Sequence, residues 1–412
     1  MKSRYEIDPN AKKPITVRRA RGLRLALAVA SSIGIWTHLA AAPFRPTSPD
    51  TVLVRLPASL VLPDPRGGLK ALPSIFSSAS AAQPEQPVAG AVHEARRWVL
   101  AARRDADPRL LGRARIPLHS WWNLESAPVD VLLLRAEIRQ GLHDFRTALT
   151  DLDRALAQDP RHPGAWLMKT TLLQTLGEYE AARRACLQLT RHADALTAIT
   201  ATAGLSGLQS EPTNAIHLLK AALDQNPSSP IPTRAWSYSV LAELQARAGF
   251  VADAETNFRH SLELESPQPH TLALLADLLL ETGHAEEVVR LLDGSTADAL
   301  RLRLAESRVR TAPHAPETQE LVESLAEGFA LSRLRGDELH LREHARFMLR
   351  IEGRAAEAAA LAKRNWQIQK EPADLQLLIE ATRSAGDTNG LTEALAWGRR
   401  HQPAVLALGG PR

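Results

Sequence analysis

Apolar residues recur at helical spacing through most of this chain. Within residues 165–189 they fall three, four or seven positions apart, the spacing of one buried face on each of two helices. These residues are Trp166, Leu173, Leu176, Tyr179, Ala182, Cys186 and Leu189. Gly177 separates the two helices, because a residue without a Cβ allows a left-handed turn. The pattern predicts a helix hairpin.

The same pattern returns at a nearly fixed interval. The small residue of each second helix falls at Ala148, Ala182, Ala215, Ala254, Val288, Ala358 and Leu391, in steps of 34, 33, 39, 34, 70 and 33 residues. The step of 70 covers two units, one of them degenerate, and a step back of 34 adds a unit at Ala114. One such hairpin buries too little apolar surface to offset its ordering entropy, so neighbours must stack. We therefore expect about nine stacked units between residues 91 and 405.

This array resembles the tetratricopeptide repeat. In the unit that ends at Pro160, six residues occupy the family's positions 8, 17, 20, 24, 27 and 32, namely Ala136, Phe145, Ala148, Leu152, Ala155 and Pro160. The third unit departs from the pattern with Pro212 in place of the usual Tyr, and the fourth carries about five extra residues. The resemblance spans roughly three quarters of the chain. It implies an all-α, right-handed superhelical solenoid whose first helices line a concave groove for a segment of a partner protein.

The resemblance also implies which residues would contact that partner. The exposed groove positions of the better units are Glu137, Gln140, Thr171, Gln174, Glu243, Arg247 and Asp277. Relatives that clamp a terminal carboxylate carry Lys and Asn, whereas this chain has Leu133, Leu167 and Ser239 at the family's position 5. Because three of the seven residues are carboxylates, a basic or amide-rich partner segment is favoured. The alternative for each residue is an ordinary solvated surface position.

The amino terminus has a different composition. Residues 1–24 hold eight basic and two acidic residues, a charge of +6, so the rest of a chain of net charge +4 carries −2. Because the excess of basic residues lies in this tail, it does not indicate nucleic-acid binding by the repeats. Residues 25–42, LALAVASSIGIWTHLAAA, contain no Asp, Glu, Lys or Arg and would span about 27 Å as a helix, close to the thickness of a bilayer.

The apolar segment 25–42 predicts a transmembrane anchor, with the basic tail in the cytoplasm and the repeats on the other side. A cleaved signal peptide is the alternative: Ala40 and Ala42 form an A-x-A pattern, but Pro43 follows at once. A twin-arginine signal at Arg18 and Arg19 fits less well. Residues 43–90 contain nine prolines and predict a flexible tether, in which TVLVRLPASLVL could form a short strand; residues 406–412 form a short tail.

The sequence contains little that points to catalysis. The single cysteine, Cys186, excludes an intramolecular disulfide and falls at a core position. His340 and His344 stand four apart on a predicted helix, the spacing of two metal ligands, but no third ligand is evident and two exposed imidazoles are expected. The SWWN stretch at residues 120–123 favours helix packing over an aromatic ligand cage.

These patterns favour a non-enzymatic scaffold without a cofactor. The leading hypothesis is a bacterial repeat protein, anchored in the inner membrane through residues 25–42, whose repeats bind another protein in the periplasm. An accessory factor or metal-dependent hydrolase built on the repeats, and a cytoplasmic regulator, are the alternatives.

Overall fold

The computed structural model describes residues 87–210, 212–336 and 339–407. The predicted basic tail, the apolar segment 25–42, the tether as far as residue 86 with its possible strand, and residues 408–412 lie outside the described residues. The described residues all belong to one compact unit, Ala82–Arg412. Among the described helices, none combines the length and the apolar character needed to cross a bilayer.

The described ranges contain α-helices and one 3₁₀ helix, with no strand. Their bounds are α2 Val88–Asp105, α3 Arg109–Arg115, η1 Ile116–Trp121, α4 Val129–Gly141, α5 Phe145–Gln158, α6 Pro163–Thr175, α7 Tyr179–His192, α8 Ala195–Gln209, α9 Thr213–Gln225, α10 Ile231–Arg247, α11 Val251–Leu264, α12 Pro269–Glu281, α13 Ala285–Leu292, α14 Asp298–Thr311, α15 Pro316–Leu334, α16 Leu341–Arg350, α17 Ala355–Ile368, α18 Pro372–Ser384, α19 Thr388–His401 and α20 Pro403–Ala407. Helix α2 begins at Val88, inside the range assigned to the tether.

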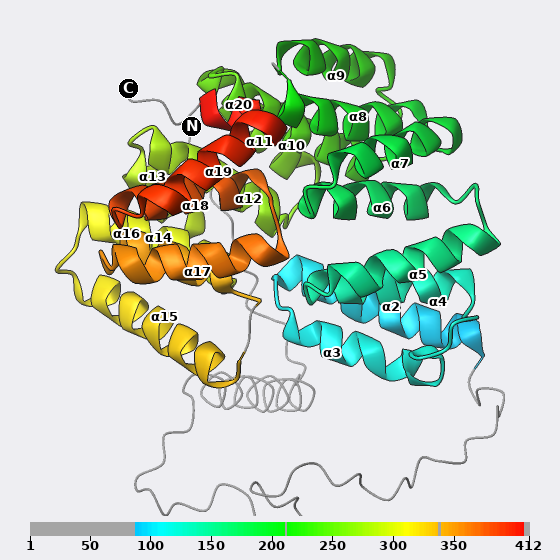
Figure 1. Cartoon of the computed structure of the whole chain (residues 1–412), viewed down its shortest axis with the longest axis horizontal. Coiled ribbons are helices and arrows are strands. Elements are labelled where there is room, and N and C mark those ends of the chain that lie inside the picture. The colour runs from blue at the N-terminus through cyan, green and yellow to red at the C-terminus, as the bar shows by residue number, and fades with distance from the viewer. Residues whose placement is uncertain (1–86, 211, 337–338, 408–412) are drawn as a thin grey trace, which may run out of the picture. The chain divides into compact units, whose positions relative to one another are not determined.

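Successive helices pack as pairs, and each pair stacks on the next (Figure 1). Over the described residues, α2 to α19 make nine such pairs, beginning with α2 and α3 and ending with α18 and α19, before the short helix α20. The predicted all-α repeat solenoid is confirmed, whereas its right-handed sense stays a prediction. The first helix of a pair is called its inner helix below, and these are the even-numbered helices from α2 to α18.

Helix crossings explain the small residues that set the repeat interval. Ala148, Ala182, Ala254, Val288 and Ala358 are each 0% exposed and each is the fourth residue of the second helix of its pair. Because these side chains are fully buried where helices pack, a larger side chain would have to displace its neighbours. The degenerate unit contains α15, a helix of 19 residues whose Leu325 and Phe329 pack into the same core as Phe347 of α16.

Left-handed glycines end several inner helices. Gly177, Gly249, Gly283, Gly353 and Gly386 follow α6, α10, α12, α16 and α18 with φ between 67° and 85°. A side chain is disfavoured at such φ values, which is why glycine returns at the repeat interval.

The ninth pair of helices contacts the third pair. The backbone N–H of Lys370 donates to the carbonyl oxygen of Thr175 at 2.7 Å. Gln402 Nε2 donates to Tyr179 Oη at 2.5 Å and to the carbonyl oxygen of Lys370 at 2.8 Å. The Trp397 ring lies 6.2 Å from that of Tyr179, and α20 packs on α8 and α10 (Figure 1). We call Thr175, Gly177, Tyr179, Lys370, Trp397 and Gln402 the closure contact.

Two sequence-based expectations about side chains are confirmed. Cys186 is 5% exposed, and burial raises the pKa of its thiol. Trp121 and Trp122 are 4% and 8% exposed within the core of the first two pairs, so the SWWN stretch packs helices together. The guanidinium of Arg115 lies 4.6 Å from the centre of the Trp122 ring.

The expected exposure of both His340 and His344 is wrong. His344 is 8% exposed, and its ring stacks on Phe329 at 4.8 Å, because α15 runs past this face of α16. Burial lowers the pKa of His344, which favours its neutral form. Both histidines border a small cavity of about 70 Å³, and no group of three metal-ligating side chains occurs in the described part of the chain.

Candidate functional site

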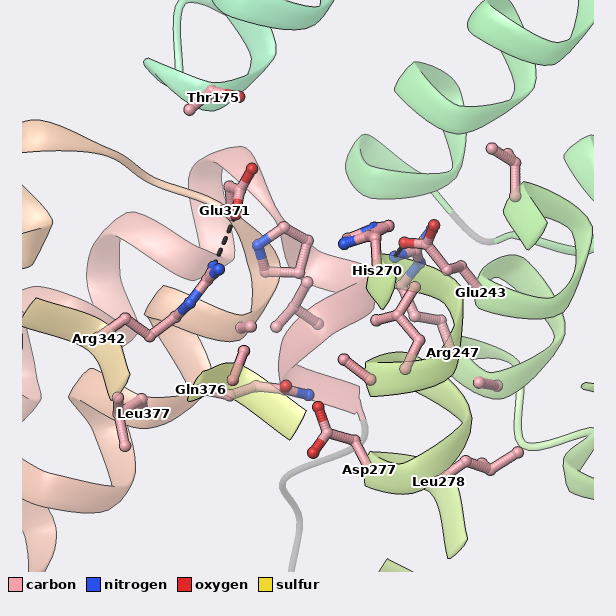
Figure 2. A pocket seen from close by; sticks show the side chains of 18 of the residues that line it. Thr175, Glu243, Arg247, His270, Asp277, Leu278, Arg342, Glu371, Gln376 and Leu377 are labelled. Atoms are coloured by element: carbon pink, nitrogen blue, oxygen red, sulfur yellow. Dashed lines mark hydrogen bonds and ion pairs between the residues drawn. The ribbon is translucent and has the colours of Figure 1, made fainter. Parts of the chain in front are cut away.

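A cavity of about 550 Å³ lies along the inner helices of the array. Its walls come from α6, α8, α10, α12, α14, α16 and α18, with Gln402 and Val405 added by the C-terminal end. Figure 2 shows side chains of α10, α12, α16 and α18 converging on it, with Thr175 of α6 beyond. Seven stacked pairs therefore contribute to one site, and the closure contact forms part of its wall.

Five of the seven residues predicted to bind a partner line this cavity. Thr171, Gln174, Glu243, Arg247 and Asp277 are all in its wall.

The other two predicted residues, Glu137 and Gln140, are not among the lining residues. Both are half-buried on α4. The Arg103 guanidinium lies 2.6 Å from a Glu137 carboxylate oxygen, and burial raises the pKa of Glu137.

Carboxylates and guanidinium groups form a continuous network on one wall. We define the ion-pair network as Asp277, Arg303, Glu306, Arg346, Arg350 and Glu380, which come from α12, α14, α16 and α18. Arg303 donates to both oxygens of Asp277, at 2.9 and 2.6 Å. Arg346 Nη1 lies 2.7 Å from Asp277 Oδ1, and Arg346 also pairs with Glu306, which is 1% exposed.

The network holds Asp277 in the charged form. Burial alone would raise the pKa of Asp277, but the guanidinium groups of Arg303 and Arg346 outweigh it and lower the pKa to about 2. The pKa of Arg346 is raised, because Asp277 and Glu306 outweigh the desolvation of its guanidinium. The carboxylates of this wall are therefore already neutralised by arginines of neighbouring pairs.

A second group of charges surrounds the start of α18. Arg342 Nη1 lies 2.7 Å from Glu371 Oε2 and 3.4 Å from Asp374 Oδ1 (Figure 2 shows the first pair). The side chains of Glu371 and Asp374 form a capping box at the N-terminus of α18. Arg342 outweighs the effect of burial and lowers the pKa of Glu371.

Arg247 differs from the other arginines of the cavity. Its side chain is 10% exposed, and its carboxylate partner, Glu243 on the same helix, lies 3.4 Å away. The Nε atoms of Arg247 and Arg350 are both buried without a hydrogen-bond partner, so the distance to the carboxylate partner is what sets Arg247 apart. His270 of α12 also lines the cavity (Figure 2).

Sequence reasoning missed the arginines of α16. Arg342, Arg346 and Arg350 stand four apart, so they share one face of the helix, and all three line the cavity. This spacing is visible in the sequence, in the same stretch that drew attention to His340 and His344. Groove positions were assigned only in the better-matching units, and the unit of α16, although Ala358 marks its phase, was not among them.

Comparison with known proteins agrees with the repeat geometry. Residues 140–198 match a family model described as tetratricopeptide repeat. This part of the chain carries the tetratricopeptide repeat pattern. Repeats of this kind form scaffolds for interaction with other proteins or peptides. No curated protein sequence matches the chain.

Several solved structures are distantly similar. PilW, a type IV pilus biogenesis factor, is 15% identical with a TM-score of 0.34, over 68% of this chain and 97% of that chain. The human IFIT1 dimer with PPP-AAAA is 13% identical with a TM-score of 0.41, over 74% and 70% of the two chains. A tetratricopeptide repeat protein from Parabacteroides merdae is 14% identical with a TM-score of 0.34, over 71% and 99%. At these scores the likenesses carry no argument about function.

Proposed function

We propose that this protein is a membrane-tethered scaffold that binds a segment of another protein in the cavity along its inner helices. One observation carries the proposal: seven stacked pairs and the C-terminal end direct side chains into one cavity of about 550 Å³. The cavity mixes charged residues with apolar ones such as Trp236, Val240 and Leu274, as ligand sites in proteins generally do.

The size of the cavity limits what it holds. An α-helix with its side chains is about 10 Å across and rises about 1.5 Å per residue, so this volume takes roughly one helical turn, or a few residues of extended chain. The bound element is therefore a short segment, while the rest of the partner stays outside the cavity.

The location is a further part of the proposal. Eight basic residues precede the apolar segment 25–42, and this order places the tail in the cytoplasm and the repeats in the bacterial periplasm. The proline-rich residues that follow then act as the tether.

Site-specific photo-crosslinking in the native cell tests the binding function. A photoreactive amino acid replaces Gln376, which lines the cavity, or Arg184, which is exposed on α7 and serves as the control. We expect a discrete adduct with one partner from position 376 and none from position 184. Equal labelling at both positions, or no adduct at 376, contradicts the proposal.

A fusion experiment tests the location separately. Alkaline phosphatase or a cytoplasmic fluorescent protein is joined after residue 86, before α2 begins at Val88. Phosphatase activity of the first fusion is the expected result. Fluorescence of the second without phosphatase activity of the first places the repeats in the cytoplasm and refutes this part of the proposal.

A further inference from the structure

We propose that Arg247 is the anchor of the cavity and that it takes an acidic side chain from the partner segment. This inference rests on the proposed function and specifies the chemistry of its ligand. It reverses the expectation from sequence, in which the carboxylates of the inner helices favoured a basic or amide-rich segment.

Two carboxylates that line the cavity, Asp277 and Glu371, already have close arginine partners. Asp277 receives Arg303 at 2.6 Å and Arg346 at 2.7 Å, and Glu371 receives Arg342 at 2.7 Å. A basic ligand would have to displace a guanidinium from each of them. Glu281, at the end of α12, also lines the cavity, but burial raises its pKa and so disfavours its charged form.

The other arginines of the cavity each have a close carboxylate partner, although the Nε of Arg350, like that of Arg247, is buried without a hydrogen-bond partner. Arg303, Arg342, Arg346 and Arg350 each have a carboxylate oxygen at 2.6 or 2.7 Å. For Arg247 the corresponding distance is 3.4 Å, to Glu243 one turn earlier on α10.

Burial makes this incomplete pairing costly. The Arg247 side chain is nine-tenths removed from water, at 10% exposed, and its Nε–H has no acceptor. A guanidinium binds a carboxylate best through two parallel N–H donors, and desolvated donors without acceptors lower stability. A ligand carboxylate that enters the cavity supplies the missing acceptor.

The surroundings of Arg247 define the rest of the ligand. His270 of α12 also lines the cavity (Figure 2) and offers a polar side chain to a ligand. Val240 and Trp236 lie about two and about three turns before Arg247 on α10, and Leu274 lies about one turn after His270 on α12. All three are in the cavity wall. The structure therefore fits an acidic residue flanked by apolar side chains, within a segment of a few residues.

Substitutions of Glu243 and Arg247, both on α10, are expected to change ligand binding in opposite directions, and this allows a sharp test. Glu243 competes with the ligand for Arg247, so Glu243→Gln frees the guanidinium and strengthens binding of an acidic segment. Arg247→Gln removes the anchor and weakens it. If a basic segment binds instead, Glu243→Gln weakens binding.

The experiment uses the full-length chain and pools of pentapeptides with blocked ends. The central residue is Glu, Gln or Lys, and the flanking positions are mixtures of Leu, Val, Phe and Trp. Binding is measured by fluorescence anisotropy for the unchanged protein, Arg247→Gln, Glu243→Gln and the control Arg184→Gln. Blocked ends remove the terminal carboxylate, so only the side chain provides the negative charge.

We expect the Glu pool to bind roughly tenfold more tightly than the Gln pool, because one charge-assisted hydrogen-bonded pair is gained. This preference disappears in Arg247→Gln, increases in Glu243→Gln and is unchanged in Arg184→Gln. Preference for the Lys pool, equal binding of all pools, or a Glu preference that survives in Arg247→Gln overturns the inference. A photo-crosslink from position 376 that persists unchanged in Arg247→Gln leaves the scaffold function standing and refutes the anchor alone.

Discussion

Replacing Arg346 by methionine removes the guanidinium that joins Asp277 to Glu306. Methionine retains an unbranched apolar stem, so the change deletes the charge and leaves much of the packing in place. Asp277 retains Arg303 at 2.6 Å, whereas Glu306, 1% exposed, retains only Arg350 at 3.6 Å. Removing one partner of a buried ion pair costs roughly 3–5 kcal/mol. Since each carboxylate retains one arginine, we expect a loss near the lower limit, about 3 kcal/mol.

The same substitution changes how stability depends on pH. In the folded protein the pKa of Asp277 is lowered from 3.8 to about 2, so its contribution is complete above about pH 4 and is lost as the pH falls through 2. A shift of this size corresponds to about 2 kcal/mol. Without Arg346 the pKa of Asp277 lies closer to its ordinary value. The difference in stability between the two proteins therefore narrows between pH 5 and pH 2.

The assay is urea unfolding of the full-length chain, followed by circular dichroism at pH 7 and at several lower pH values. The control is Arg184→Met, because Arg184 is exposed on α7. We expect Arg346→Lys, which retains the charge but not the paired donors, to lie between the other two. If Arg346→Met unfolds within about 1 kcal/mol of the control, or if its deficit is constant from pH 5 to pH 2, the network does not stabilise the stacking of these pairs.

Two further predictions use matched pairs of substitutions. A Cβ at Gly177 would lie 2.9 Å from Lys370 Cδ, whereas a Cβ at Gly283 has no heavy atom within 4 Å, and the two glycines have similar φ values of 74° and 85°. Thermal unfolding of Gly177→Ala should therefore begin at a lower temperature than that of Gly283→Ala; equal values would show that the closure contact does not restrict this position. Ala358 is 0% exposed at a helix crossing, and Ala360 on the same helix is exposed, so Ala358→Leu should cost about 1–3 kcal/mol in urea unfolding and Ala360→Leu close to nothing.

Much of the local structure could be predicted from the sequence because the same packing and turn requirements recur in each repeat. Alanines at helix crossings and glycines after inner helices depend on contacts within a pair or between adjacent pairs. The same reasoning explains why five predicted positions line the cavity, since each stands on the inner face of its own helix. These are Thr171, Gln174, Glu243, Arg247 and Asp277.

The closure contact could not be predicted in this way. Gln402 bonds to Tyr179 across 223 positions of sequence, and no repeat pattern specifies such a contact. It depends on the accumulated rotation between pairs, which the five extra residues near α10 and the degenerate unit alter. The same rotation decides which inner helices surround the cavity, and it leaves Glu137 and Gln140 of α4 outside the lining.

The charge of the site was misjudged for a related reason. Asp277 stands on α12, while the arginines that neutralise it stand on α14 and α16. A set of groove positions taken from the better units includes Asp277 as available for a ligand, because the arginines that neutralise it belong to two later units that were not among them. The carboxylate partner of Arg247 is Glu243, which stands on the same helix. For Arg247, therefore, the groove position in the sequence correctly indicates a side chain that a ligand can reach.

Hydrogen exchange at the backbone amide of Lys370 tests most directly whether the array closes to form the cavity. This amide lies between α17 and α18, and its acceptor is the carbonyl oxygen of Thr175 in the third pair, at 2.7 Å. We predict that it exchanges as slowly as amides in the middle of α18, and that Gly177→Ala accelerates it while Gly283→Ala does not. Exchange at the rate of an unstructured peptide in the unchanged protein would contradict the closure, and with it the cavity on which both proposals depend.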